Sequence, residues 1–338
     1  MTTSPRGSAR RRPTLNDVAQ QAGVSVSQVS ASINGSAGPS KRTREYILKV
    51  AEQMGYRPNQ VASALARARS YRIGVVFALS HPFHADVVER MYPAAETMGY
   101  ELVLSGYAAS RPVVRCAEIL VDSQCEALVL VGAGAVSADV PRVAQLTRTV
   151  AVGSAKAVTG VDVVRSAGET GARLAVEHLS SLGHSRIACV DGRDLSGAEY
   201  RRNGYLQAMT ALGLDRQACV IPGGDSYASG YAVGELVQGA SHTAYVAYND
   251  ECAIGLIDAL QDGGLRVPQD ISVVGYDNEP AAKLPRIRLT TLSQDAAGIA
   301  DLAIRQAVRA IEEPQEPTQE LVVPPQLVVR GTTAASKR

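Results

Sequence analysis

Short apolar runs of strand character alternate with amphipathic helical patterns over most of the chain. The alternation forms two blocks, residues 73–153 and 186–276, which a long predicted helix at 169–182 separates. Apolar strands between helices are typical of parallel sheets that are buried on both faces and joined by right-handed crossovers. The sequence therefore predicts an α/β core of two open parallel sheets.

The predicted strands of the first block are 73–79, 101–107, 127–131 and 149–153, and its helices are 86–98, 113–122 and 140–146. The second block has strands at 186–190, 218–221, 244–248 and 271–276, and helices at 200–212, 229–238 and 250–261. The remaining elements are a strand at 289–292, a helix at 296–312 and short runs at 320–323 and 326–330. Elements placed after two complete blocks predict a chain that crosses back to finish both sheets.

This crossing predicts two lobes, one of about 71–163 plus 292–322 and the other of about 164–290 plus 323–333, followed by a tail at 334–338. Two hinged sheets of this kind place the carboxyl ends of their strands around a shared cleft, which is the usual ligand position.

The stretch Thr14–Asn34 contains two helical patterns around a turn at Gly23, where glycine supplies the positive φ that a tight turn needs. Thr14 with Asp17 is the pattern of a capping box, and Ser25 is a candidate N-cap for the second helix. The apolar positions repeat at helical spacing: Leu15, Val18, Ala19, Ala22, then Val26, Val29 and Ile33. The pattern predicts an all-α helix-turn-helix, whose second helix enters the DNA major groove. A generic pair of packed helices is the alternative.

A third helix is predicted at 40–54, with Ser40 as its cap and Gly55 at its end. Its expected apolar stripe is Tyr46, Ile47, Val50 and Met54. The three helices make a domain at 13–58, which follows a basic tail at 1–12 that we expect to be disordered. The Ala-rich segment 59–70 is too short for a stable isolated helix. It is interpreted as a linker, or as a segment that folds when its partner arrives.

Charge is divided unevenly along the chain. Residues 1–72 carry 12 Lys/Arg against 3 Asp/Glu, a balance of +9, and residues 73–338 carry 22 against 30, a balance of −8. We call the basic residues 1–72 the head and the acidic residues 73–338 the body. This division of charge indicates that only the head binds a polyanion. A solvated basic tail is the alternative for the first arginines.

The five cysteines are scattered without a CxxC pair, which favours buried thiols in a reducing compartment over disulfides or a zinc site. No apolar run is long enough for a membrane span, and the N-terminus lacks the apolar region of a signal peptide. We expect a soluble, cytoplasmic protein with no membrane contact.

Several motifs occur in a fixed order: TLNDVAQQAGVSVSQVS, SKRTRE, MGYRPN, LGHSRIA, YNDECAIG, ISVVGYDN and PQLVVRGTT. With these motifs the chain resembles the LacI/GalR family of bacterial transcriptional regulators over about residues 13–333. The resemblance implies a DNA-binding head, a hinge helix and a two-lobed core like that of periplasmic sugar-binding proteins. It further implies a homodimeric repressor on a pseudo-palindromic double-stranded DNA operator, controlled by a sugar-like small molecule between the lobes.

The resemblance assigns base contacts to the start of the second helix. Gln28 is suited to pair with adenine, Val26 to touch a thymine methyl group, and Ser27 to donate or accept; core packing is the alternative for Val26. Ala31 stands where many relatives carry Arg, so the operator sequence cannot be copied from them. The implied phosphate contacts are Thr14, Ser25, Asn34, Ser40, Arg42 and Arg44. In the hinge, which begins near Asn59, Leu65 aligns with the leucine that relatives insert into a minor-groove step; an ordinary buried leucine is the alternative.

The resemblance also implies effector-binding residues. They are Arg201, Asn249 and Asp277, with Tyr227 as the weakest because its segment departs from the family pattern. Phe77 and Phe83 are added as the only two phenylalanines of the chain, because both lie at the exit of the first strand, where an aromatic face could stack on a ring. Arg201 as a helix-surface charge, and Asn249 and Asp277 as helix or turn caps, are the structural alternatives. Another departure is His81-Pro82-Phe83-His84, where relatives often have Asn-Pro-Phe-Phe.

Other functions have weaker support. The glycines at 132 and 134 lack the rest of a dinucleotide motif, and His81 with His84 lacks a third metal ligand, so we expect no cofactor and no metal. No nucleophile elbow or carboxylate pair indicates an enzyme. A solute-binding protein with the same two-lobed core is the remaining alternative, and it would need a signal peptide and no basic head. The last residues contain no leucine heptad, so a dimer is expected and not a tetramer.

Overall fold

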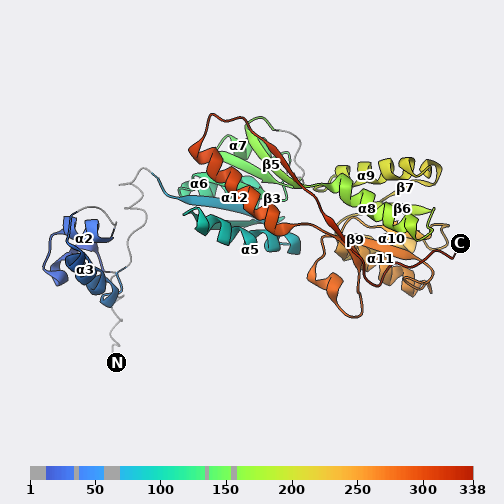
Figure 1. Ribbon diagram of the computed structural model, residues 1–338, viewed down its shortest axis with the longest axis horizontal. Coiled ribbons are helices and arrows are strands. Elements are labelled where there is room, and N and C mark those ends of the chain that lie inside the picture. Colours follow the sequence, from blue (N-terminus) through green and yellow to red (C-terminus); the bar gives the residue numbers. More distant parts are fainter. Residues whose placement is uncertain (1–12, 34–37, 57–68, 134–136, 154–157, 338) are drawn as a thin grey trace, which may run out of the picture. The chain divides into compact units, whose positions relative to one another are not determined.

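The computed structural model describes residues 13–33, 38–56, 69–133, 137–153 and 158–337. Contacts divide the chain after Ser70 into two compact units, 1–70 and 71–338. Figure 1 colours both units along the sequence. The predictions for the basic tail at 1–12, for Asn34, and for Asn59 and Leu65 in the hinge lie outside the described residues.

The described residues of the first unit form three helices, α1 (Leu15–Ala22), α2 (Val26–Ile33) and α3 (Lys41–Gln53). Thr14 begins α1 with the predicted capping box: its backbone N–H donates to Asp17 Oδ2 at 2.7 Å, and the Asp17 N–H donates to Thr14 Oγ1 at 3.3 Å. Gly23 then has φ +67°, which lets the chain turn sharply into α2.

The core of this unit consists of the inward faces of the three helices: Val18, Ala19, Ala22, Val29, Ile47, Val50 and Ala51. The predicted stripe of α3 was wrong at Tyr46, whose side chain is 51% exposed. Tyr46 directly precedes Ile47, so it lies about 100° away around the helix, where it faces solvent.

The second unit consists of two lobes, each built on a six-stranded sheet. The strand order of the first sheet is β11-β5-β4-β3-β1-β2, and that of the second is β12-β10-β9-β8-β6-β7. All neighbouring strands pair parallel except β10 with β12, which pair antiparallel. The two mostly parallel sheets confirm the predicted fold class.

The strands of the first sheet are β1 (Arg72–Ala78), β2 (Glu101–Tyr107), β3 (Ala127–Val131), β4 (Arg148–Val152), β5 (Val161–Ser166) and β11 (Glu320–Val323). Its helices are α5 (Pro82–Thr97), α6 (Val113–Asp122), α7 (Val140–Ala144) and α12 (Ala296–Glu312). One face packs on α5 and α12, the other on α6 and α7, so both faces are covered (Figure 1).

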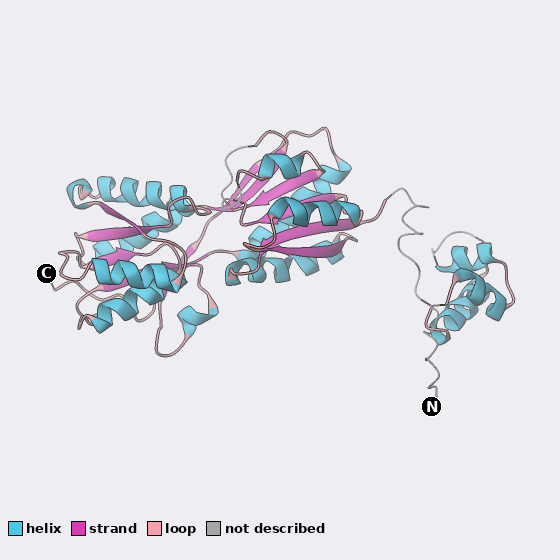
Figure 2. Ribbon diagram, turned by 180° about the vertical axis from the view of Figure 1, so that it is seen from behind, coloured by secondary structure: helices cyan, strands magenta, loops and turns pink. Residues whose placement is uncertain are grey.

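The strands of the second sheet are β6 (Ile187–Asp191), β7 (Cys219–Pro222), β8 (Ala244–Val246), β9 (Ser272–Tyr276), β10 (Thr290–Ser293) and β12 (Gln326–Val328). Its helices are α8 (Gly168–Ser181), α9 (Ala198–Ala211), α10 (Tyr227–Leu236) and α11 (Asp250–Asp262), with the short 3₁₀ segments η1 (Asp215–Gln217) and η2 (Pro280–Lys283). Helices α8 and α9 cover one face, and α10 and α11 the other (Figure 2).

Three sequence-based expectations need correction. Strand β5 was not predicted, although three of the four residues 161–164 are valine, and it extends the first lobe to Ser166. Strand β10 lies in the second sheet and β11, through Val323, in the first, so both crossings fall a few residues from the expected boundaries. Residues 334–336 are not a separate tail: the Ala334 N–H donates to Ser272 Oγ, and the Ser336 N–H to the Leu182 carbonyl.

Candidate functional site

The start of α2 presents three consecutive exposed side chains, Val26, Ser27 and Gln28. Val26 is 42% exposed, so the core-packing alternative for it is wrong, whereas Val29, one turn further along α2, is fully buried. An exposed row at a helix start, backed by a packed core, is the geometry that a recognition helix needs in the major groove. Ala31, one turn on, is half-buried.

Gln28 also has a structural role that the sequence analysis missed. Its Oε1 accepts from the Ser25 backbone N–H at 3.1 Å, while the Gln28 N–H donates to Ser25 Oγ at 3.2 Å. Ser25 and Gln28 thus form a second capping box of the Ser-x-x-Gln type. The three-residue spacing of Ser25 and Gln28 could have predicted this capping box from the sequence.

Among the predicted phosphate contacts, Thr14 and Ser40 both cap helices. Ser40 Oγ accepts from the Thr43 N–H at 3.2 Å. Ser40 and Arg42 are exposed, and Arg44 is half-buried. Helix starts with free N–H groups bind phosphate readily, so the capping role is compatible with the predicted one.

In the second unit, a cavity lies where the two lobes meet. The empty space between its walls, open solvent included, is about 820 Å³. The walls come from the ends of β3, β4 and β5 and the start of α5 in the first lobe, and from α9 and the loops after β6, β7, β8, β9 and β10 in the second. In each sheet the strand order reverses between neighbouring strands, β1 with β3 and β6 with β8, and a ligand cleft is expected at such points.

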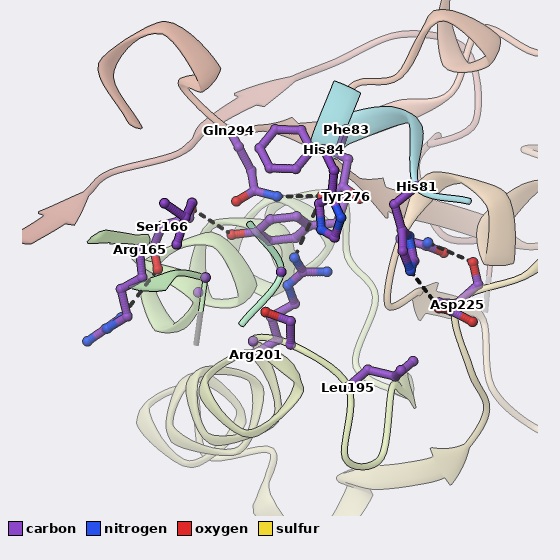
Figure 3. Close-up of a pocket in the computed structure, with 18 of the residues that line it drawn as sticks. His81, Phe83, His84, Arg165, Ser166, Leu195, Arg201, Asp225, Tyr276 and Gln294 are labelled. Carbon is purple, nitrogen blue, oxygen red and sulfur yellow. Dashed lines mark hydrogen bonds and ion pairs between the residues drawn. The ribbon is translucent and has the colours of Figure 1, made fainter. Parts of the chain in front are cut away.

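Arg201, on α9, is the centre of the second-lobe wall (Figure 3). Its guanidinium carbon lies 3.7 Å from the centroid of the Tyr276 ring and 4.6 Å from that of Tyr248. Its Nη1 donates to the Tyr248 carbonyl, and its Nη2 lies 3.6 Å from Asp277 Oδ1. Burial opposes the charge, but the Asp277 carboxylate and the tyrosine rings outweigh it and raise the pKa of Arg201.

Asp277 occupies the carboxyl end of β9 with φ +108°, which turns the chain sharply beside the cavity. Gln294 Nε2 donates to Asp277 Oδ1 at 2.6 Å. Burial raises the pKa of Asp277, and the Arg201 charge and the Gln294 hydrogen bond oppose this rise. Asp277 therefore serves first to hold Arg201, which leaves part of its hydrogen-bonding capacity for the cavity.

Asn249 lines the cavity, but its amide is used inside the protein. Its Oδ1 accepts from the Cys252 N–H at 2.9 Å, which caps α11, and its Nδ2 donates to the Asp225 carbonyl at 2.7 Å. The cap alternative thus describes Asn249 correctly. We infer that it positions the loop of Asp225.

Two histidines from the start of α5 reach the cavity. His81 Nε2 lies 3.3 Å from Asp225 Oδ2 of the second lobe (Figure 3). This hydrogen bond raises the pKa of His81 and lowers that of Asp225. His84 is buried beside it, which lowers its pKa to about 3, so its ring is neutral, and its Nδ1 has no hydrogen-bond partner.

Two predicted effector residues do not line this cavity. Phe77 points with Ile73 and Val75 into the core beneath α5 and α12, because alternate side chains of a strand share a face. Tyr227 is 45% exposed, and its hydroxyl donates to Asp258 Oδ2 at 2.9 Å. The structure places the other four on the wall: Phe83, Arg201, Asn249 and Asp277.

The sequence analysis missed further wall residues. Tyr248 and Tyr276 directly precede two predicted residues at strand ends, and Arg165 and Ser166 lie on the unpredicted β5. Arg165 Nη1 donates to Glu169 Oε2 at 3.1 Å. The other polar residues of the wall are His81, His84, Ser196, Tyr200, Asp225 and Gln294.

No group of three metal-ligating side chains exists among the described residues. In the same part of the chain, no helix is long and apolar enough to cross a membrane.

A two-lobed ligand-binding core joined to a helix-turn-helix defines a ligand-controlled DNA-binding protein. Residues 14–59 match the family described as bacterial regulatory proteins, lacI family, and residues 176–333 match the periplasmic binding protein-like domain. The HTH-type transcriptional regulator DegA of Bacillus subtilis is 30% identical over 333 residues, covering 96% of this chain and 98% of DegA.

Two solved structures extend the similarity. The Lac repressor dimer bound to operator and the anti-inducer ONPF is 27% identical with a TM-score of 0.82, covering 96% of this chain and all of that one. The transcriptional regulator CelR–cellobiose complex is 27% identical with a TM-score of 0.70, covering 95% and 100%. The chain belongs to the LacI family, whose members are DNA-binding transcriptional regulators and not enzymes.

Proposed function

We propose that this protein is a homodimeric repressor of a pseudo-palindromic operator, and that an uncharged, hydroxyl-rich ligand of the sugar class binds in the interlobe cavity and changes its affinity for the operator. The observation that carries the proposal is the exposed row Val26–Gln28 at the start of α2. Two copies of this helix read two half-sites, as the two-fold symmetry of a dimer requires.

Operator binding is tested by fluorescence anisotropy with the full chain and a site selected from random DNA. Phosphate contacts by the basic head make affinity fall steeply with salt. The Gln28→Ala variant is expected to lose about 1–3 kcal/mol at one base pair of each half-site and to tolerate substitution there. Arg42→Ala is the matched comparison: it should weaken all sites alike. Uniform weakening by Gln28→Ala would contradict the base-reading assignment.

The walls of the cavity favour an uncharged ligand. Each charged side chain on the wall already has an opposite charge within the protein: Arg201 has Asp277, Arg165 has Glu169, and His81 has Asp225. A charged ligand would have to break one of these pairs. The wall also carries hydroxyl and amide groups, at Ser166, Ser196, Tyr200 and Gln294, next to the apolar surfaces of Phe83, Val131 and Ile299. That mixture suits a hydroxylated ring with an apolar face.

Thermal-shift screening tests the ligand class, because a ligand that binds only the folded state raises the melting temperature. The panel is ribose, galactose, cellobiose, their phosphorylated counterparts and free purines. A rise in melting temperature with an uncharged sugar should vanish in Phe83→Ala and persist in Tyr227→Ala, because Phe83 lines the cavity and Tyr227 does not. A shift with purines or phosphorylated sugars alone would overturn the proposed class.

The hinge proposal concerns Leu65, which lies outside the described residues. By resemblance to the family, Leu65 enters a minor-groove step at the centre of the operator and kinks it. Leu65→Ala should therefore lower operator affinity by more than the loss of one surface contact. Unchanged affinity in a gel-shift titration would count against this hinge.

Sedimentation equilibrium tests the proposed dimer, and a mass of four chains would contradict it.

A further inference from the structure

We propose that His81 and Asp225 form a proton-dependent clasp across the interlobe cleft, so that protonation of His81 holds the two lobes of the core together. The inference concerns the regulation of the cavity and rests on its proposed function as the effector site.

The clasp joins parts of the chain that belong to different sheets. His81 begins α5 in the first lobe, and Asp225 lies in the loop between β7 and α10 in the second. Their side chains are 31% and 30% exposed, so both are largely withdrawn from water, and Nε2 lies 3.3 Å from Oδ2. Because the partners belong to separate lobes, this pair exists only while the lobes are close.

The carboxylate of the clasp is held in place. The Asn249 amide donates to the Asp225 carbonyl, and Asn249 is itself fixed as the cap of α11. Asp225 is therefore presented from a braced loop, which favours a short pair with little further loss of side-chain freedom.

The acidic groups that face His81 all belong to the second lobe. Asp225 raises its pKa by a hydrogen bond, burial opposes this, and Asp277 and Glu251 raise it further through space. On its own helix His81 faces His84, whose ring centroid is 4.8 Å away. His84 is neutral because burial lowers its pKa to about 3, so it neither repels protonated His81 nor titrates with it.

The sign of the pH effect follows from these shifts. The pKa of His81 is higher in the closed form than its ordinary value of 6.5, so the clasp is fully formed below pH 6.5 and is lost as pH rises through the raised pKa. The pKa of Asp225 in the closed form is lower than its ordinary 3.8, so the clasp begins to weaken below pH 3.8 and is lost as pH falls through the lowered pKa. The lobes are thus held together most firmly between these limits.

Histidine NMR of the full chain tests the clasp without any ligand or DNA. The chain has only five histidines, so ¹³Cε1 labelling gives few signals, and the His81 signal is the one that disappears in His81→Gln. The expected result is a His81 pKa above 6.5 that falls to 6.5 or below in Asp225→Asn. Because the two residues lie in different lobes, this coupling itself reports closure of the cleft in solution.

The matched control is Asp258→Asn, which removes another second-lobe carboxylate that bonds Tyr227 and does not face His81. It should leave the His81 pKa unchanged. A His81 pKa at or below 6.5 in the wild type, or one that Asp225→Asn leaves in place, would overturn the clasp. Either result would leave the proposed operator and sugar binding intact, since those are measured separately.

Discussion

At the scale of single residues, Gln28 shows how one side chain serves two functions. In the structure its amide oxygen completes the cap of α2, and reading a base requires the same amide to turn toward the groove. Operator binding therefore competes with a local hydrogen bond. A Ser-x-x-Gln box is weaker than one that ends in a charged carboxylate, which makes this competition less costly.

Gln28→Glu separates the two roles. The carboxylate should strengthen the cap and raise the stability of the helical unit by about 0.3–1 kcal/mol, because a negative charge at a helix start is favourable. It should weaken operator binding by about 1–3 kcal/mol, because it loses the amide donor. Circular dichroism melting and anisotropy titration measure the two effects. Weaker binding without greater stability would contradict the capping role.

Arg201 is a residue whose removal should destabilise the core strongly. Replacement by Gln leaves Asp277 buried without its cation, and breaking a buried pair in this way costs about 3–5 kcal/mol. Urea unfolding of Arg201→Gln should show this loss. The control is Arg173→Gln, which breaks the exposed pair with Glu177 and should cost less than about 1 kcal/mol. If the two variants lost the same free energy of unfolding, the buried Arg201–Asp277 pair would contribute no more to stability than an exposed pair.

Glu279 makes stability depend on pH. Burial, helped by Asp277 and Asp250, raises its pKa to about 8, against 4.5 in the unfolded chain. The folded protein then keeps a proton that the unfolded chain releases, so the free energy of unfolding falls as pH rises from about 4.5 to about 8.

Glu279→Gln should remove the part of this decline that Glu279 causes. The variant should match the wild type near pH 4.5 in urea unfolding and exceed it at pH 8.5, because Gln imitates the protonated acid. Glu118→Gln, which removes the acid of an exposed pair with Arg115, is the control. It should leave the free energy of unfolding unchanged both near pH 4.5 and at pH 8.5. Parallel pH profiles for Glu279→Gln and the wild type would disprove the raised pKa.

At the scale of elements, close packing of helices explains residues that no motif singled out. A Cβ at Gly255 of α11 would lie 2.0 Å from the Tyr227 carbonyl oxygen of α10. The two helices thus touch backbone to backbone at this glycine, on the face of the second sheet opposite α8 and α9.

Gly255→Ala should force α10 and α11 apart. Overpacking of this kind costs about 1–3 kcal/mol, and the neighbouring atoms are backbone that cannot rotate away. The urea midpoint should fall with an unchanged slope. Thr210→Ala, at an exposed position of α9, is the comparison and should stay within about 0.5 kcal/mol of the wild type. An unchanged urea midpoint in Gly255→Ala would show that α10 and α11 can move apart without loss of stability.

At the scale of the whole molecule, the division after Ser70 separates the charges as well as the contacts. A chain shortened to residues 71–338 should keep its melting temperature and lose retention on heparin and DNA, while residues 1–70 keep that retention with a steep salt dependence. Chromatography of both pieces measures this. Retention of 71–338 would favour polyanion binding by the core and contradict the assignment to the head.

The amino-acid sequence by itself determined the order of the elements, the helix-turn-helix and the uneven charge. Capping at Thr14, the turn at Gly23 and the apolar repeats are properties of residues within a few positions of one another, so they can be read without a fold. The same local reasoning failed at Tyr46 and at β5, where burial depends on a partner element.

Only the tertiary structure decided which side chains share the cavity. Phe77 was chosen by its place at a strand end and Tyr227 by the family pattern. In the structure the Phe77 side chain points into the core, and the Tyr227 hydroxyl bonds Asp258. The pairing of His81 with Asp225 joins residues 144 positions apart in different lobes, and no local pattern encodes it. The physical reason is that sheet order and lobe closure set these distances, and both depend on packing over the whole core.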